Sequence, residues 1–283
     1  MSDLAPALEA LLRLPGVSEG IDSAREACTA LRWHEALRRR IPEGAAESRI
    51  RGAHANAHLD GAALPLTIVR DLVRGARAWP EHLDPVEAVV KGAIQATVET
   101  EHLRTIVVKS PAQALARLHS AAVGGASGAL GETAVGRPRT PGEGCREFVE
   151  LGPAPEGDAL IARLTGITDL MSAAGSAPVA LVAALVHAEV CVVRPFARGN
   201  GIVARALERA IVHAGGLDPT GVSVPEAGHR AAGETAYLGA LTAYATGGAD
   251  GVALWLRQAC QAYAAGAREG VLIADSVRAG RLL

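Results

Sequence analysis

The sequence predicts an all-α fold, and its composition gives the main indications. Alanine and leucine are abundant and favour helices, whereas apolar runs that alternate in the manner of strands are scarce. The chain has 283 residues, of which 49% are hydrophobic, and this is enough material for a large core. We therefore expect a helical protein with one main core.

Proline and glycine divide the chain into helical stretches. The first predicted helix stops at Pro15-Gly16, and the second is closed by Pro42. The third ends at Asp60-Gly61, because glycine tolerates the left-handed conformation that terminates many helices. The predicted helices cover residues 4–14, 21–40, 45–59, 65–78, 85–101, 111–123, 159–174, 178–193 and 201–214, with two more after residue 237.

Residues 124–158 interrupt this helical pattern with a run rich in glycine, proline and charge. The composition predicts a long loop, with a short hairpin around residues 146–151. Loops of this length inside a compact domain are usually functional or disordered.

Charge and cysteine usage exclude several classes of protein. The formal net charge of -2 leaves no basic field for nucleic acid or a membrane surface. Four well-separated cysteines indicate neither a zinc site nor a disulfide framework. The acidic N-terminus does not resemble a signal peptide. The most apolar run, residues 177–193, is short and carries His187 and Glu189, so it predicts a buried core helix rather than a membrane span. We expect a cytoplasmic protein without a metal site.

The segment from Arg194 to Arg205 carries the functional signal. Its Gly199-Asn200-Gly201 turn stands at the start of a predicted helix, where free backbone N–H groups and the helix dipole favour an anion. Arg194, Arg198 and Arg205 would place cations nearby. The alternative is a tight turn with solvated arginines.

This segment resembles the Fic-family signature H-P-F-x-(D/E)-G-N-G-R-x-x-R. The residues that match it are Pro195, Phe196, Gly199, Asn200, Gly201 and Arg205. His187, seven residues upstream of Arg194, matches a histidine that Fic proteins often carry. Residues 136–139 resemble the G-x-x-R that opens the substrate-docking flap of the family, and residues 137–157 stand where that flap belongs.

The resemblance covers roughly residues 45–215, and its implications concern fold, activity and partners. It implies a Fic-like helical bundle with a flap-like loop, a helical N-terminal extension over residues 1–90, and a core with C-terminal helices over residues 91–283. Fic proteins of this kind transfer AMP from ATP to a hydroxyl of a target protein. A target protein would then dock at the flap over residues 137–157.

A second resemblance concerns regulation. Asn56, Asp60 and Gly61 are similar to the inhibitory motif (S/T)-x-x-x-E-(G/N) found N-terminal to many Fic cores. There the glutamate reaches the second motif arginine, which implies that Asp60 would reach Arg205. A helix-terminal Asp-Gly stop explains the same residues without regulation.

The three departures from the signature fall on residues that perform chemistry. Arg194 replaces the histidine that acts as the base, and a guanidinium stays protonated. Arg198 replaces the acid that holds Mg²⁺, so we do not expect Mg²⁺ to bind. Ile202 replaces the first phosphate-binding arginine. The residues that remain for ATP, another nucleotide or a phosphate-containing small molecule are Gly199, Asn200, Gly201, Arg205 and Arg198.

Three hypotheses remain open on the sequence. The protein is a catalytically impaired Fic protein that keeps a nucleotide or phosphate site, or an active transferase that uses Arg198 in place of the metal, or an interaction module whose loop binds nothing. His187 is expected to be a core residue. Glu226 and His229 are expected on a surface turn, with an approach to the loop as the alternative. The oligomeric state is left open.

Overall fold

The computed structural model describes residues 4–123 and 134–281, and these residues contain helices and no strand. The prediction of an all-α fold is therefore confirmed. The helices are α1 (Leu4–Leu12), α2 (Val17–Arg32), α3 (Ile41–Leu59), α4 (Leu66–Val73), α5 (Pro85–Glu99), α6 (Ile106–Lys109), α7 (Pro111–Val123), α8 (Gly157–Ser172), α9 (Val179–Val193), α10 (Asn200–Ala214), α11 (Pro225–Ala232), α12 (Glu234–Thr246) and α13 (Gly248–Arg278).

Local sequence signals account for most of these boundaries. Gly16 adopts a left-handed conformation (φ 75°) and separates α1 from α2. The helix predicted over residues 21–40 is divided, because α2 stops at Arg32 and a short 3-10 turn follows at Glu35–Arg38. Asp84 and Glu87 form a reciprocal capping box at the start of α5.

The hairpin predicted around residues 146–151 is wrong. A 3-10 turn occupies Val149–Leu151, and Phe148 before it has a left-handed backbone (φ 49°) that no strand ladder accommodates. Part of the predicted loop, residues 124–133, lies outside the described residues. Helix α11 was not predicted from the sequence.

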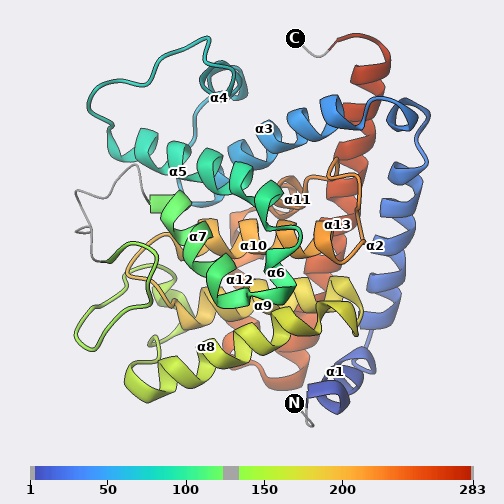
Figure 1. Cartoon of the computed structure of the whole chain (residues 1–283). Coiled ribbons are helices and arrows are strands. Elements are labelled where there is room, and N and C mark those ends of the chain that lie inside the picture. The colour runs from blue at the N-terminus through green and yellow to red at the C-terminus, as the bar shows by residue number, and fades with distance from the viewer. Residues whose placement is uncertain (1–3, 124–133, 282–283) are drawn as a thin grey trace.

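Helices α9 and α10 run through the middle of the molecule (Figure 1) and pack against each other. Nearly every residue of α9 is buried, as expected for a helix that is apolar on all sides. The long α13 packs along α2 and also contacts α11 and α12, while α3 crosses one end of the bundle and packs against α5. The division into residues 1–90 and 91–283 stays a prediction.

Within the part of the chain that the structure describes, no helix has both the length and the apolar character needed to cross a bilayer. All four cysteines are free thiols. Burial raises the pKa of the Cys191 thiol to about 12, so this thiol is unreactive.

Gly228 allows α11 to approach α13 closely. A Cβ added there would lie 2.0 Å from the carbonyl oxygen of Ala262, so the two backbones would have to separate. We expect Gly228→Ala to lower the free energy of unfolding by about 1–3 kcal/mol or more, measured by urea denaturation. Gly239→Ala on α12 is the matched control, because a Cβ there meets open space. It should raise the free energy of unfolding by about 0.5–1 kcal/mol. Equal effects of the two substitutions would contradict the close approach.

Candidate anion-binding site

The loop between α9 and α10 is held by its own side chains. The chain leaves α9 at Arg194, which has a left-handed backbone (φ 47°), and enters α10 through Gly199 (φ 80°). Asn200 spans the loop, because its Oδ1 accepts the Phe196 N–H (2.9 Å) and its Nδ2 donates to the Phe196 carbonyl (2.9 Å). The Phe196 ring stacks on His119 with ring centres 3.9 Å apart. The loop is therefore a rigid support for the first N–H groups of α10.

These N–H groups already bind an anion, the carboxylate of Glu147. Gly199 N donates to Oε1 at 2.5 Å and Asn200 N donates to Oε2 at 2.9 Å. Asn200 Nδ2 adds a third bond to Oε2 at 2.8 Å. We call Gly199, Asn200 and the donors they present the anion cradle. Sequence reasoning predicted the cradle but missed Glu147, since a single acid in a Gly/Pro-rich loop follows no pattern.

The environment of Glu147 disfavours its negative charge. Burial raises the pKa of this carboxyl, and the nearby charge of Asp60 raises it further. The bonds from Asn200 and from the Gly199 N–H lower the pKa again but do not fully compensate. The carboxylate is thus held in the cradle against an unfavourable desolvation.

Arg205 does not face an open site, because its guanidinium is fully buried and bonded. It forms an ion pair with Asp60. Its Nε donates to Asn56 Oδ1 (2.7 Å), and a terminal nitrogen donates to Tyr237 Oη (3.1 Å). A Cβ on Gly201 would lie 2.5 Å from Asp60 Oδ1, so glycine gives this ion pair its space. The Asp60–Arg205 contact that the sequence resemblance implied is present, and its inhibitory role stays a prediction.

Arg194 holds the segment that carries Glu147. Its side chain is 1% exposed. It donates to the carbonyl oxygens of Phe148 (2.9 Å) and Gly152 (2.7 Å), and more weakly to that of Glu147 (3.4 Å). Among the described residues, Phe148 and Arg194 are the two non-glycine residues with positive φ. The Arg194 side chain therefore bonds directly to the other residue with a left-handed backbone, Phe148.

The flap-like segment is also attached to the loop through Arg139 and His119. Arg139 N donates to the Pro195 carbonyl (2.7 Å) and Arg139 Nε to the Arg194 carbonyl (2.8 Å). His119 accepts from Gly136 N at Nδ1 (2.9 Å), and its Nε2 lies 3.2 Å from the Arg198 carbonyl. Burial lowers the pKa of His119 to about 4, so the ring is neutral near pH 7.

Two other residues that differ from the Fic signature, Arg198 and Ile202, lie in different environments. Ile202 is buried at 3% exposure and has no group that could bind phosphate. The Arg198 side chain is half-buried, and within residues 4–123 and 134–281 its guanidinium has no hydrogen-bond or ion-pair partner. It is the motif cation that remains available next to the cradle.

A buried polar cluster lies behind Arg205. His187, Glu208 and His229 bring ligand atoms within 4.8 Å of one another, and all three side chains are fully buried. Glu208 accepts from His229 Nε2 (3.0 Å) and Tyr263 Oη (2.7 Å), and it lies 3.0 Å from His187 Nδ1. His187 Nε2 in turn bonds Tyr237 Oη at 2.8 Å.

This cluster fits a hydrogen-bond network better than a metal site. Burial alone would raise the pKa of Glu208, but the two histidines hold it well below its ordinary value. A metal at His229 Nε2 would turn Nδ1 into a buried N–H, and Nδ1 has no partner among the described residues. The expected core position of His187 is confirmed. The surface turn expected at Glu226 and His229 is wrong, because α11 buries both side chains against α10 and α13.

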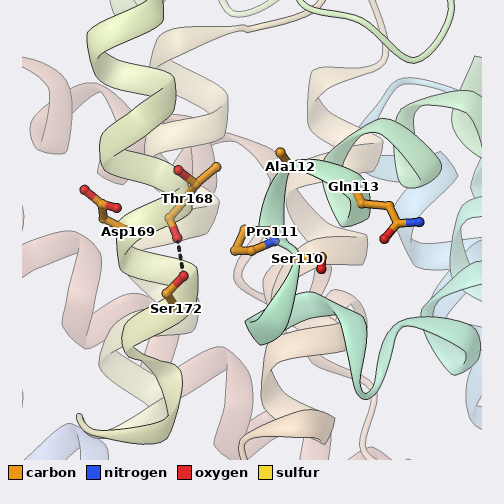
Figure 2. Close-up of a pocket in the computed structure, with 7 residues that line it drawn as sticks. All are labelled: Ser110, Pro111, Ala112, Gln113, Thr168, Asp169 and Ser172. Atoms are coloured by element: carbon orange, nitrogen blue, oxygen red, sulfur yellow. Dashed lines mark hydrogen bonds between the residues drawn. The ribbon is translucent and has the colours of Figure 1, made fainter.

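A groove of about 480 Å³ lies elsewhere, between the start of α7 and the side of α8 (Figure 2). On the α8 side of the groove, Ser172 Oγ donates a hydrogen bond to the Thr168 carbonyl at 3.0 Å. The residues that line the groove are Ser110, Pro111, Ala112, Gln113, Thr168, Asp169 and Ser172. None of them belongs to the loop between α9 and α10, so this groove is separate from the cradle.

Comparison with known proteins identifies the fold through structure and not through sequence. No family model matches the sequence, and no curated protein matches it either. Fic-1 from C. elegans superposes with a TM-score of 0.67 at 18% identity, over 96% of this chain and 75% of that chain. A Fic family protein from Desulfovibrio desulfuricans gives a TM-score of 0.69 at 20% identity, over 93% and 75%. A Fic domain containing signaling protein from Bacteroides thetaiotaomicron gives 0.62 at 12% identity, over 91% and 98%. This helical bundle, with its Gly-Asn-Gly turn at the start of α10, therefore has the Fic fold.

Proposed function

We propose that this protein binds a phosphate-containing ligand at the anion cradle and does not transfer AMP. One observation carries the proposal: the Gly199 and Asn200 donors hold a carboxylate in three short bonds. Donors that bind a carboxylate in this geometry are also suited to two oxygens of a phosphate. ATP, another nucleotide or a smaller phosphate compound would be the ligand class.

Charge favours small ligands over Mg·ATP. Arg205 is neutralised by Asp60, and the position that holds Mg²⁺ in Fic adenylyltransferases, by the resemblance, is Arg198 here. The available positive charge is the Arg198 guanidinium together with the N-terminal dipole of α10. We therefore infer a preference for one or two phosphate groups without Mg²⁺, and weak affinity.

The alternative, an active transferase that uses Arg198 in place of a metal, rests on the same cation. Arginine stabilises phosphoryl charge in transition states. This alternative needs a base, and by the resemblance the position of the Fic base is Arg194, whose guanidinium cannot accept a proton. The Glu147 carboxylate is already bound by the cradle donors. We favour the binding function for this reason. A module that binds nothing at the loop is the third possibility.

Titration calorimetry with AMP, ADP and pyrophosphate, with and without Mg²⁺, tests the proposal. The unmodified protein should bind ADP or pyrophosphate weakly and gain nothing from Mg²⁺. Arg198→Ala should weaken binding about tenfold or more, because a charge-assisted bond contributes about 1.5–3 kcal/mol. Arg268→Ala, an exposed arginine of α13, is the control of equal charge change and should bind as the parent does. Unchanged affinity in Arg198→Ala, or no heat at millimolar ligand, would contradict the site.

A further inference from the structure

The carboxylate of Glu147 uses the donors that an incoming anion would need. The first N–H groups of a helix have no partner within the helix, so Gly199 N and Asn200 N depend on an external acceptor. In this structure Glu147 provides that acceptor for both N–H groups and for the Asn200 amide. Two anions cannot share these donors.

We propose that Glu147 is an internal ligand that closes the anion cradle, so that a phosphate group enters only by displacing it. This inference rests on the proposed function, because it concerns the regulation of the same site. It assigns the closing role to residue 147 of the flap-like segment. The Asp60–Arg205 ion pair is a separate contact, and it leaves the cradle donors untouched.

Arg194 supplies the hold that keeps Glu147 in place. Its guanidinium binds the carbonyl oxygens of Phe148 and Gly152, on the C-terminal side of Glu147. Phe148 and Arg194 both adopt left-handed backbone conformations, which cost free energy in non-glycine residues and persist only where the surroundings enforce them. The Arg194 bonds therefore hold the closed segment against local strain.

Opposing charges surround the Glu147 carboxylate. Asp60, directly after α3, repels the carboxylate. The Gly199 and Asn200 donors at the start of α10 attract it, and so does the charge of Arg194. Cys145 lies beside the same donors, with its Sγ 3.5 Å from Asn200 Nδ2. Burial and Asp60 together raise the pKa of Glu147, so placing the ionised carboxylate in the cradle costs free energy. A ligand that brings its own phosphate oxygens can compete with such an occupant.

Two measurements on the whole 283-residue chain test the closure. The first is amide hydrogen exchange at Gly199 and Asn200, read by NMR. In the parent these amides should exchange slowly, and in Glu147→Ala they should exchange at least about tenfold faster, because their acceptor is gone. The Val203 amide, which bonds the Gly199 carbonyl at 3.0 Å, reports whether α10 itself stays intact.

The second measurement is pyrophosphate affinity by calorimetry. If the cradle is closed most of the time, the apparent affinity is reduced by the open fraction, so Glu147→Ala should bind about tenfold tighter or more. Glu147→Gln, which keeps the shape and loses the charge, should lie between parent and alanine variant. Glu150→Ala is the matched control, since it removes an exposed acid from the same segment, and it should resemble the parent in both measurements.

The outcomes separate this inference from the proposed function. Equal pyrophosphate affinity in the parent and Glu147→Ala would overturn the closure while leaving the phosphate site in place. Slow exchange of Gly199 and Asn200 in Glu147→Ala would also overturn it. If Glu147→Ala exposes both amides and still binds no pyrophosphate, the cradle is no phosphate site, and the proposed function fails together with its regulation.

Discussion

Purified protein incubated with labelled ATP and Mg²⁺ is expected to transfer no AMP to itself or to added proteins above background. By the resemblance to the Fic signature, Arg194 stands at the position of the base, and its guanidinium donates to backbone carbonyls and cannot accept a proton. Loss of a positioned base alone costs on the order of 10²–10⁴ in rate. By the same resemblance, Arg198 stands in place of the metal ligand and Ile202 in place of one phosphate-binding arginine. Labelling followed by intact-mass analysis measures the result.

Arg194→His is the informative variant for this prediction. It restores the residue type of the base but leaves Arg198 and Ile202 unchanged, so we expect it to stay near background. It also removes the bonds that Arg194 makes to Phe148 and Gly152, and it should therefore loosen the segment around Glu147. An active adenylyltransferase assayed in parallel sets the detection limit. Clear AMP transfer by the unmodified protein would instead support the metal-independent transferase.

The second large effect concerns stability, at the buried ion pair of Arg209 and Glu226. Both side chains are fully buried, and Arg209 binds the two carboxylate oxygens at 2.7 and 2.9 Å. Arg209 also donates to Ser48 Oγ of α3 at 3.1 Å. Arg209→Ala leaves the Glu226 charge without its partner in the core, so we expect the free energy of unfolding to fall by about 3–5 kcal/mol. Urea denaturation followed by circular dichroism measures this.

The double variant Arg209→Met, Glu226→Leu distinguishes a lost ion pair from lost packing. It removes both charges and keeps most of the volume, and such replacements are often neutral in stability. Recovery of most of the parental free energy of unfolding is expected. The exposed Arg268→Ala should change it by less than about 0.5 kcal/mol. A double variant as unstable as Arg209→Ala would show that the ion pair is not the source of the effect.

The main helices and the cradle follow from short-range pattern. The helix predicted over residues 178–193 is α9 (Val179–Val193), and the helix predicted over 201–214 is α10 (Asn200–Ala214). Both could be predicted because apolar helix formers bounded by proline and glycine favour a helix through local interactions alone. The prediction of a hairpin near residue 148 was wrong, because the left-handed backbone of Phe148 is stabilised by Arg194, a residue far along the chain. The short helix α11 was missed, because its burial against α13 depends on the glycine at position 228 and a neighbour far along the chain.

The sequence by itself determined the fold class, the turn at Gly199 and Asn200, and the presence of a guanidinium at position 194, because each depends on residue type and near neighbours. Only the tertiary structure decided what occupies that turn. The bond between Glu147 and the start of α10 joins residues 52 and 53 positions apart, and the ion pair of Asp60 with Arg205 spans 145. Contacts of that separation arise from how the helices pack, and the donors at the start of α10, which have no partner within the helix, bind the carboxylate that packing places beside them.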